Sequence, residues 1–351
     1  MKRVLTVLAA ALLAACSPHL GREGWGERPY EALQALVQAD GVRGGYAVFD
    51  CDNTTVLHDV SHNLTIYMLE NLLFRDAPAH NFTDGLSDPD LILPGFQVSA
   101  SEAGKGLAEE FYALRRMLDG GMSLNEVHTT DLYLDYRARF MAFDEALGEV
   151  YSYAELCYWE PLLASGYPED ALRELGAGSI AYWMSQGRVW KEDWVSPDGR
   201  FFGTAEKGLV VTPWMKDLYR TLSRAGITPY ICSASVEWLV ELLACNPEYG
   251  ICLPPEQVFG IRLGEEDYPQ PFQEGKVACI NRFMAPLHGG KAPLLVAGDS
   301  SGDVAMLTSY PEMRVGLIID HSRGGDIGEL AGSDDPRYVS QPVNIPHIDA
   351  R

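Results

Sequence analysis

The sequence predicts an α/β fold: a doubly wound, mostly parallel sheet with a large, mainly helical domain inserted after its first strand. After residue 206, short apolar runs alternate with helical patterns, which is typical of parallel sheets covered by helices on both faces. Before it, roughly 150 residues carry helical periodicity and few strand signals. We therefore expect a core from residues 30–55 and 206–351, with a cap domain from residues 56–205.

The individual elements follow from periodicity and from punctuating residues. A helix over residues 30–39 leads into a buried strand at 46–49. In the cap, apolar residues at helical spacing predict helices over 60–74, 106–118 and 132–150, and residues 77–100 form a loop. The expected core elements are a helix at 213–225 with Thr212 as N-cap, a strand at 227–232, a helix at 236–243 capped by Ser235, a strand at 257–262, a helix at 276–283, a strand at 293–297, a helix at 303–307 and a last strand at 314–319. The tail after Gly324 is expected to be irregular.

The chemistry is expected to centre on residues 46–54, YAVFDCDNT. Asp50 and Asp52 directly follow a buried strand, at the sheet edge where α/β folds bind ligands. Two like charges this close are costly unless a cation or a bound substrate shares them. The alternative is a strand-ending Asx turn on the surface.

Three later stretches favour the functional interpretation. An apolar strand ends in the S-A-S of residues 233–235, a lysine follows a glycine in residues 274–277 (EGKV), and a third strand leads into residues 298–303 (GDSSGD). In this order the motifs resemble the haloacid dehalogenase (HAD) superfamily of phosphatases, in its phosphoserine phosphatase-like branch. The motifs cover the start and the last third of the chain. The GDSSGD stretch departs from the branch's usual G-D-G-x-N-D, which leaves the role of Asp303 open.

The resemblance implies a HAD-like Rossmannoid core and a role for each motif residue. Asp50 is expected to attack phosphorus and form an aspartyl phosphate. Asp52 is expected to act as general acid and then as general base. Asp50, the backbone carbonyl of Asp52, and Asp299 would ligate Mg²⁺, while Asp303 would support the water shell of the metal or hold the loop.

The remaining motif residues are expected to bind the substrate phosphate. The resemblance assigns one phosphate oxygen to the hydroxyl of Ser233, another to the amide of Ala234, and charge neutralisation to Lys276. Alternatively, Ser233 caps a helix, Lys276 is a solvated helix residue and Asp303 is an N-cap.

Substrate selection is expected to come from the cap, which is rich in aromatic residues. Aromatic faces beside carboxylates bind quaternary ammonium groups. The branch includes secreted phosphorylcholine phosphatases, to which the sequence is similar in its first two motifs and in its export signal, so phosphocholine is the leading candidate substrate. Alternatives are phosphoserine, a broad-specificity acid phosphatase or phosphotransferase, and an inactive binding lipoprotein. The alternative is that the aromatics form the core of the cap. They are Tyr133, Tyr136, Tyr151, Tyr153, Tyr158, Trp159, Tyr182, Trp183, Trp190 and Trp194, and the candidate charge partners are Glu70, Glu155, Glu160 and Asp193.

The N-terminus predicts export. Lys2 and Arg3 precede an apolar run, and Leu-Ala-Ala-Cys follows. This pattern resembles a bacterial lipobox, which implies cleavage before Cys16 and lipidation of its thiol. Residues 17–29 would form a tether, and Ser17 favours attachment to the outer membrane from the periplasm. The alternative is a plain signal peptide.

The formal charge of −22 makes nucleic acid and anionic membrane surfaces poor partners, so membrane contact is expected only through the lipid anchor. The expected partner is a small phosphomonoester, for which the site must supply local positive charge from Lys276 and Mg²⁺.

Cysteine and histidine offer weaker signals. Cys245 and Cys252 flank a turn-like segment and form the best candidate disulfide of an exported protein. Cys51 has no histidine nearby in the sequence, so we interpret it as a small buried residue rather than a catalytic thiol. His58 and His62 have a zinc-like i, i+4 spacing but no evident third ligand, and we interpret them as surface or cap-contact residues.

Overall fold

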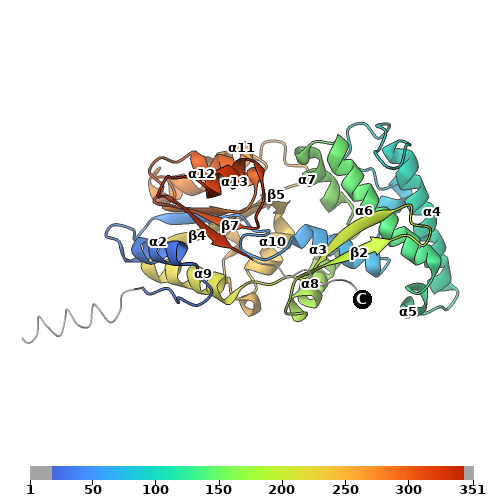
Figure 1. Cartoon of the computed structure of the whole chain (residues 1–351), viewed down its shortest axis with the longest axis horizontal. Helices are drawn as coiled ribbons and strands as arrows, with labels where there is room; N and C mark the ends of the chain where they lie inside the picture. The colour runs from blue at the N-terminus through green and yellow to red at the C-terminus, as the bar shows by residue number, and fades with distance from the viewer. Residues whose placement is uncertain (1–17, 344–351) are drawn as a thin grey trace, which may run out of the picture.

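A six-stranded parallel sheet forms the centre of the computed structural model, which describes residues 18–343 (Figure 1). All five strand pairings in this sheet are parallel, as the sequence predicts. In spatial order the strands are β5 (Val258–Ile261), β4 (Thr228–Val236), β1 (Tyr46–Phe49), β6 (Leu295–Gly298), β7 (Val315–Asp320) and β8 (Tyr338–Pro342).

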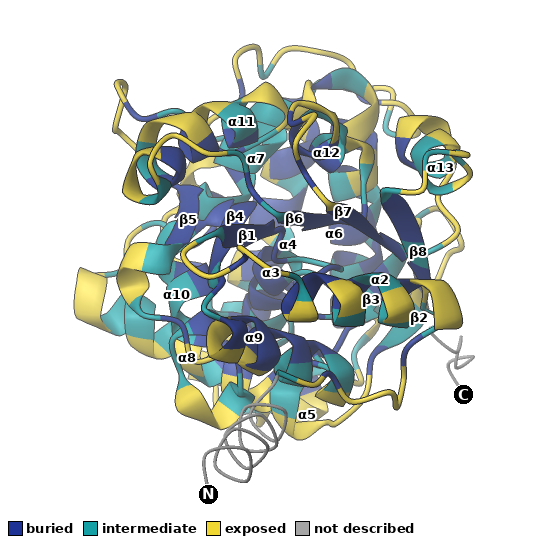
Figure 2. Ribbon diagram, turned by 90° about the vertical axis from the view of Figure 1, so that its left-hand side faces the viewer, coloured by how far each residue is buried: buried dark blue, intermediate teal, exposed yellow. Residues whose placement is uncertain are grey.

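Helices cover both faces of the sheet (Figure 2). One layer holds α11 (Glu274–Cys279), α12 (Val304–Thr308) and α13 (Gly325–Ala331), and the other holds α2 (Glu27–Gln38), α9 (Pro213–Ala225) and α10 (Glu237–Ala244). The side chains of β1 alternate between the layers, since Tyr46 and Val48 pack with the first and Ala47 and Phe49 with the second. The predicted α/β fold class is confirmed.

The chain between β1 and α9 forms a mainly helical body beside the sheet, at the right of Figure 1. Its elements are α3 (Val60–Glu70), η1 (Ala77–His80), α4 (Ala100–Asp119), α5 (Leu124–Val127), α6 (Asp131–Val150), α7 (Tyr153–Leu162), α8 (Glu169–Ser185), β2 (Trp190–Val195) and β3 (Phe202–Lys207). The antiparallel β2–β3 hairpin was not predicted, because β2 reads WKEDWV and its charged residues hide the strand pattern.

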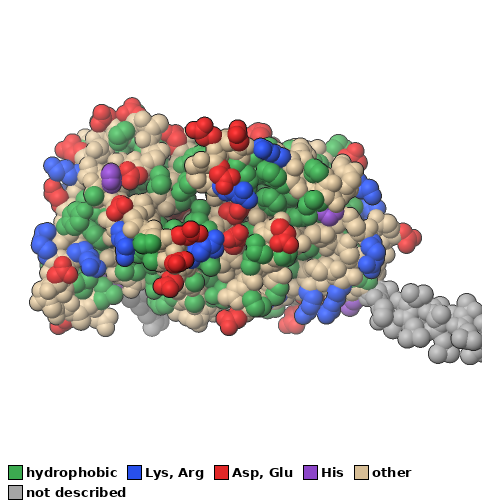
Figure 3. Space-filling view, turned by 180° about the vertical axis from the view of Figure 1, so that it is seen from behind, with side chains coloured by type: hydrophobic (Ala, Val, Ile, Leu, Met, Phe, Trp, Pro, Cys, Tyr) green, Lys and Arg blue, Asp and Glu red, His purple; other side chains and the backbone are tan. Residues whose placement is uncertain are grey.

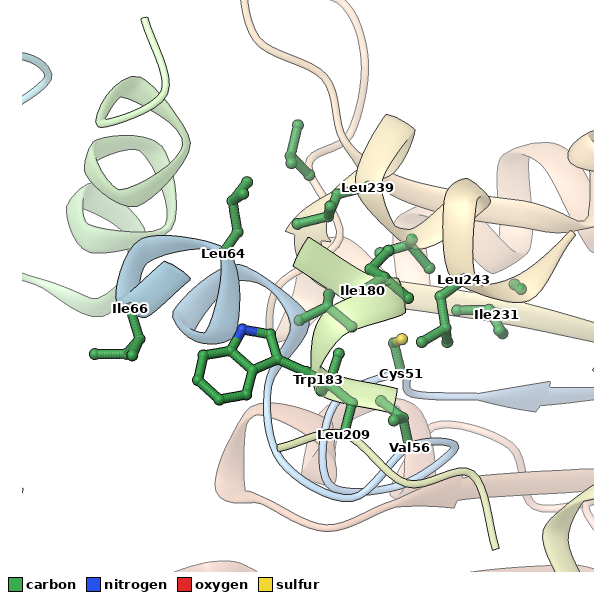
Figure 4. Packing of buried hydrophobic residues seen from close by; sticks show 14 of the residues in the cluster. Cys51, Val56, Leu64, Ile66, Ile180, Trp183, Leu209, Ile231, Leu239 and Leu243 are labelled. Atoms are coloured by element: carbon green, nitrogen blue, oxygen red, sulfur yellow. The ribbon is translucent and has the colours of Figure 1, made fainter. Parts of the chain in front are cut away.

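One hydrophobic cluster runs from beneath the sheet into the inserted helices. Figure 4 shows Trp183 of α8 next to the α3 helix that carries Leu64, with Leu239 and Leu243 of α10 nearby. The indole nitrogen of Trp183 also donates to the carbonyl of Asn63 at 2.7 Å. The inserted helices therefore share buried packing with the sheet.

Two segments differ from the sequence-based expectation. The tail is not irregular, because it forms α13 and then β8, whose Tyr338 pairs with Gly316 at the sheet edge. Residues 18–29 are not a free tether, because Leu20 is fully buried, Trp25 packs on Trp214 with ring centroids 4.7 Å apart, and α2 already begins at Glu27. The expected signal peptide and the lipidation of Cys16 lie outside the described residues.

The predicted helix bounds were confirmed for α9, whereas α4 begins at Ala100 rather than at residue 106, and α7 and α8 were not predicted. α9 spans the predicted residues, and the hydroxyl of Thr212 accepts from the amide of Met215 as an N-cap. Ser235 does not cap α10, because β4 continues through it and Val236 occupies the N-cap position.

All cysteines of the described region are free, so the Cys245–Cys252 disulfide is not formed. Cys245 ends α10, while Cys252 is exposed and its thiol contacts the carbonyl of Pro247. Within residues 18–343, no helix combines the length and the apolar character that a membrane crossing requires. Acidic side chains are spread over the face in Figure 3, in keeping with the formal charge of −22.

Candidate active site

The site lies where three neighbouring parallel strands end. β1 pairs with β4 on one side and β6 on the other, so their carboxyl ends bring Asp50, Ser233 and Asp299 to one edge of the sheet. The amide of Asp50 donates to the carbonyl of Ala297 at 2.9 Å, which fixes the position of Asp50 relative to β6.

A buried lysine joins two of the acidic residues. Lys276 Nζ lies 2.7 Å from Asp50 Oδ1 and 2.6 Å from Asp303 Oδ1, and all three side chains are buried. Burial raises the pKa of Asp50, the charge of Asp303 adds to the rise, and Lys276 opposes it, which leaves the pKa at about 7. Lys276 is thus a buried ion-pair partner rather than a solvated helix residue.

Asp299 has an oxygen that no hydrogen-bond donor satisfies. Its Oδ1 accepts from the Thr54 hydroxyl at 3.3 Å, while its buried Oδ2 accepts no hydrogen bond from the described residues. Arg323 Nη2 lies 3.1 Å from Oδ2 but without hydrogen-bond geometry. Burial and the charge of Asp303 raise the pKa of Asp299, which Arg323 partly opposes.

These residues fit a hard divalent cation. Asp50, Asp299 and Asp303 each place a carboxylate oxygen within 4.8 Å of those of the other two. Carboxylate oxygens are the ligands that Mg²⁺ prefers, and the unpaired Asp299 Oδ2 is a buried acceptor that such an ion would satisfy. The predicted pair of carboxylate ligands, Asp50 and Asp299, therefore lies together.

Asp303 is occupied in holding the loop. Its Oδ1 binds Lys276, and its Oδ2 accepts from the amides of Asp299 and Ser300 at 3.0 and 3.2 Å. Gly298 permits this close approach, because a Cβ at that position would lie 2.4 Å from the Cβ of Asp303. Of the two expected roles, the structure favours holding the loop.

Asp52 faces β4 and the start of the cap. Its Oδ2 accepts from the hydroxyls of Ser235 at 2.7 Å and Ser233 at 3.3 Å, and its Oδ1 accepts from the amide of Val60 at 2.8 Å. Burial raises the pKa of Asp52, as do the charges of Asp59 and Asp50, against the lowering effect of these hydrogen bonds.

Only some of the residues expected to bind the substrate phosphate line the cavity over the site. Ser233 is fully buried, and its hydroxyl accepts from the amide of Ser235 and donates to Asp52. Ala234 lines the cavity over the site, as does Ser235, which sequence analysis treated only as a helix cap. The second serine of S-x-S was the available signal for this missed residue.

The cavity has a volume of about 350 Å³, and core and cap residues line it. From the core come Asp50, Asp52 and Asp299 together with Arg323, which sequence analysis did not single out.

Three cap carboxylates, namely Asp59, Asp144 and Glu160, also line the cavity, together with Trp159. Burial and the surrounding carboxylates raise the pKa of Glu160 well above its usual range, and burial also raises that of Asp144. The cap side of the cavity therefore gathers carboxyl groups that hold their protons more tightly than usual, and a bound cation would favour their ionised forms.

Most other cap residues singled out from the sequence lie elsewhere. Glu70 pairs with Lys207 at 2.7 Å, Glu155 caps the start of α7, and Asp193 accepts from Thr204. Of the ten cap aromatics named from the sequence, Tyr153 and Trp159 line the cavity.

The two histidines also separate. His62 lines the cavity and contacts the cap hairpin, where its Nε2 accepts from the amide of Glu206 at 3.3 Å. His58 is buried, and its Nδ1 lies 3.1 Å from the carbonyl of Lys207 at the end of β3, so it is a cap-contact residue rather than a surface one. It precedes α3 and does not share a helix with His62.

Comparison with known proteins gives a relative with the expected chemistry. The chain is similar to a phosphorylcholine phosphatase. That protein, from Pseudomonas aeruginosa, is 27% identical over 335 residues, which cover 85% of this chain and 80% of the relative. The similarity confirms the expected resemblance to phosphorylcholine phosphatases and supports a phosphatase hydrolase. No protein-family model matches the chain.

A solved structure shares the fold. A conserved protein of unknown function from Anaerococcus prevotii superposes with a TM-score of 0.78 at 25% identity, covering 94% of this chain and 98% of that one. The match spans both the sheet and the inserted helices, so the whole architecture recurs in that protein.

Proposed function

We propose that the chain is a Mg²⁺-dependent phosphomonoester hydrolase that acts through an aspartyl phosphate on a small ester with a cationic end, with phosphocholine as the leading candidate. One observation carries the proposal: a single cavity joins the Asp50, Asp52 and Asp299 cluster to a cap wall of three carboxylates. The name of the Pseudomonas aeruginosa relative supports the same substrate.

Asp50 is the proposed nucleophile. Lys276 and the amide of Cys51 both bind its Oδ1, which orients the carboxylate at the end of β1. Attack by a carboxylate oxygen on phosphorus breaks the bond to the ester oxygen and leaves the phosphoryl group on Asp50.

Asp52 is the proposed proton-transfer residue. It gives a proton to the leaving alkoxide, then takes one from the water that attacks the aspartyl phosphate and releases inorganic phosphate. Three hydrogen bonds from Ser233, Ser235 and Val60 fix its orientation. This anchoring keeps it in place through both steps.

Asp50 and Asp299 would hold Mg²⁺, which neutralises charge on the transferring phosphoryl group when bound. Lys276 adds a fixed buried charge beside Asp50. Together these cations offset the repulsion that the acidic site would otherwise exert on a phosphate.

The cap wall favours a cationic leaving group. Asp59, Asp144 and Glu160 line the same cavity as the phosphate site, and Trp159 supplies an aromatic ring whose nitrogen donates a 2.7 Å hydrogen bond to the carbonyl of Phe82. Carboxylates and an indole attract a quaternary ammonium group. This arrangement favours phosphocholine over phosphoserine, whose carboxylate the wall would repel.

We also propose a location in the bacterial cell envelope, as a lipoprotein in the periplasm attached to the outer membrane through Cys16. The proposal rests on the basic start, the apolar run and the Leu-Ala-Ala-Cys sequence. Labelling with a radioactive fatty acid, compared between wild type and Cys16→Ser, tests it. Equal labelling of the two would refute lipidation at Cys16.

The activity is tested by phosphate release with Mg²⁺ from phosphocholine, phosphoethanolamine, phosphoserine, nucleotides and p-nitrophenyl phosphate. We expect phosphocholine to react fastest and Asp50→Asn to be inactive while folded. Comparable rates on all esters would favour a broad-specificity phosphatase, and phosphoryl transfer to added alcohols would show a phosphotransferase. A folded wild type that is inactive on every ester would support a binding lipoprotein instead.

A further inference from the structure

A second cation reaches the site from outside the four sequence motifs. Arg323 follows β7, and its side chain remains 44% exposed while its Nη2 lies 3.1 Å from Oδ2 of Asp299, which is only 3% exposed. Arg323 lines the main cavity and also an adjoining one of about 330 Å³. Its guanidinium group thus lies between solvent and the acidic cluster.

The loop that carries Arg323 is held in place on its N-terminal side. His321 Nε2 lies 2.7 Å from the carbonyl of Asn53, which ties the loop to the Asp50–Asp52 segment. The amide of Ser322 donates to Asp320 at 2.7 Å. The backbone carbonyl of Arg323 packs against Gly328, where a Cβ would lie 2.6 Å from that oxygen. The backbone is therefore fixed, and the side chain is the part free to change partner.

The site without a metal is short of positive charge. The carboxylates of Asp50, Asp52, Asp299 and Asp303 face one buried lysine and the guanidinium of Arg323. A phosphomonoester brings roughly two further negative charges at neutral pH. Even with a divalent cation bound, an additional cation at the cavity would stabilise the incoming phosphate.

Asp299 Oδ2 has two candidate partners with different geometry. Arg323 contacts it without forming a hydrogen bond, so the pair is mainly electrostatic. A divalent cation held by Asp50 and Asp299 would compete with Arg323 for the carboxylate of Asp299. A guanidinium released from Asp299 keeps its planar set of donors, which matches the oxygens of a phosphate.

We propose that Arg323 is a phosphate-binding residue that Asp299 retains in the metal-free protein and that Mg²⁺ releases toward the substrate. This role rests on the proposed phosphatase function for its substrate, and it predicts two opposite effects of removing the guanidinium. Mg²⁺ should bind more tightly without phosphate, because a competing cation is gone. Phosphate should bind more weakly in the presence of Mg²⁺.

The test compares the wild-type chain with Arg323→Gln and Arg323→Lys by calorimetry. Arg220→Gln is the matched control, because Arg220 also pairs with a carboxylate, Asp217, but is 60% exposed on α9. Mg²⁺ is titrated alone, and inorganic phosphate is then titrated at saturating Mg²⁺. For Arg323→Gln we expect about tenfold tighter Mg²⁺ and about tenfold weaker phosphate. Arg323→Lys should keep the wild-type Mg²⁺ affinity. It should bind phosphate with intermediate affinity, because an ammonium group lacks the planar, forked set of N–H donors that a guanidinium group presents to phosphate oxygens.

Two results would overturn the proposal: an Mg²⁺ affinity that does not rise in Arg323→Gln, or a phosphate affinity that does not fall. A change of the same size in Arg220→Gln would do so as well. Hydrolysis by the wild type is measured separately, so an inactive wild type that still shows both binding effects would refute the proposed function and leave the role of Arg323 standing.

Discussion

The hydroxyl of Ser235 donates to Oδ2 of Asp52 across 2.7 Å, so the end of β4 orients the second aspartate of the D-x-D motif. The hydroxyl of Ser61 in turn donates to Ser235 at 3.0 Å. Since Ser61 lies in the first turn of α3, the cap helps to set the direction of the Ser235 hydroxyl. Ser235 is therefore a positioning residue for Asp52.

Replacing Ser235 should impair turnover more than binding. We expect Ser235→Ala to lower kcat at least about tenfold with little change in KM, because Asp52 loses its shortest side-chain hydrogen bond. Steady-state kinetics on phosphocholine and p-nitrophenyl phosphate measure the effect. Ser235→Thr keeps the hydroxyl and should recover most of the rate, while Ser223→Ala, on α9, should change neither constant. A kcat equal to wild type in Ser235→Ala would contradict this role.

Removing Lys276 should destabilise the fold. Lys276→Met leaves Asp50 and Asp303 buried without their cation, which should cost about 3 kcal/mol or more of unfolding free energy. Urea denaturation followed by circular dichroism gives the value. Mg²⁺ should stabilise this variant more than the wild type, because the three carboxylates remain clustered.

Lys105→Met is the matched control for Lys276. Lys105 pairs with Glu109 on the exposed face of α4, and both side chains are at least 66% exposed. We expect a change within about 0.5 kcal/mol. Equal effects of the two substitutions would show that burial of the Lys276 pair does not matter to stability.

His58 should make the protein sensitive to mild acid. Burial lowers the pKa of His58 from 6.5 to about 4, with Glu206 opposing the shift and His62 and Lys191 adding to it. The folded state therefore binds fewer protons than the unfolded state between these values. Stability from this residue is complete above about pH 6.5 and is lost as the pH falls toward 4, by up to about 3 kcal/mol.

The measurement for His58 is the slope of the melting temperature between pH 7 and pH 5. His58→Asn tolerates the positive φ of 63° at this position and removes the titrating ring. We expect a shallower slope in the variant, whatever its absolute stability. An unchanged slope would show that His58 titrates alike in both states.

The cap carboxylates should select for a cationic substrate. Glu160→Gln and Asp144→Asn should each raise KM for phosphocholine about tenfold and leave KM for p-nitrophenyl phosphate unchanged or lower, because a bound ammonium group would favour the ionised form of each carboxyl, which an amide cannot adopt. Glu149→Gln, an exposed residue of α6, serves as control. Equal changes in KM for both substrates would show that the cap carboxylates do not discriminate between substrates by charge.

Residues that follow a strand could be located from sequence, because a buried apolar run fixes where its end lies. Asp50, Asp52 and Asp299 were found this way, and Ser233 was found because the apolar run of β4 ends just before it, although the strand continues to Val236. Arg323 could not be, since nothing in its loop signals that it reaches Asp299. Asp59, Asp144 and Glu160 come from three separate elements of the cap, and only tertiary packing brings them to one wall.

The secondary structure also divides into elements that local sequence predicts and elements that depend on tertiary packing. Thr212-Pro213 marked the start of α9 because capping and proline act locally. β8 and the β2–β3 hairpin were missed because their strands carry polar residues and are formed by pairing with a neighbour rather than by a local pattern. Ser235 was misassigned as a cap because it directly precedes the predicted helix, while the strand in fact continues through it.

The position of β1 in the sheet has a consequence for biosynthesis. Tyr46 pairs with Thr228 and Ala47 with Leu295, so both neighbours of β1 are made long after it. A nascent chain that has completed β1 and the inserted helices still holds an unpaired apolar strand with both edges open. Such non-local pairing slows folding, and the catalytic edge can close only after the last third of the chain emerges. A premature stop before β6 would therefore leave an aggregation-prone fragment rather than a weakened enzyme.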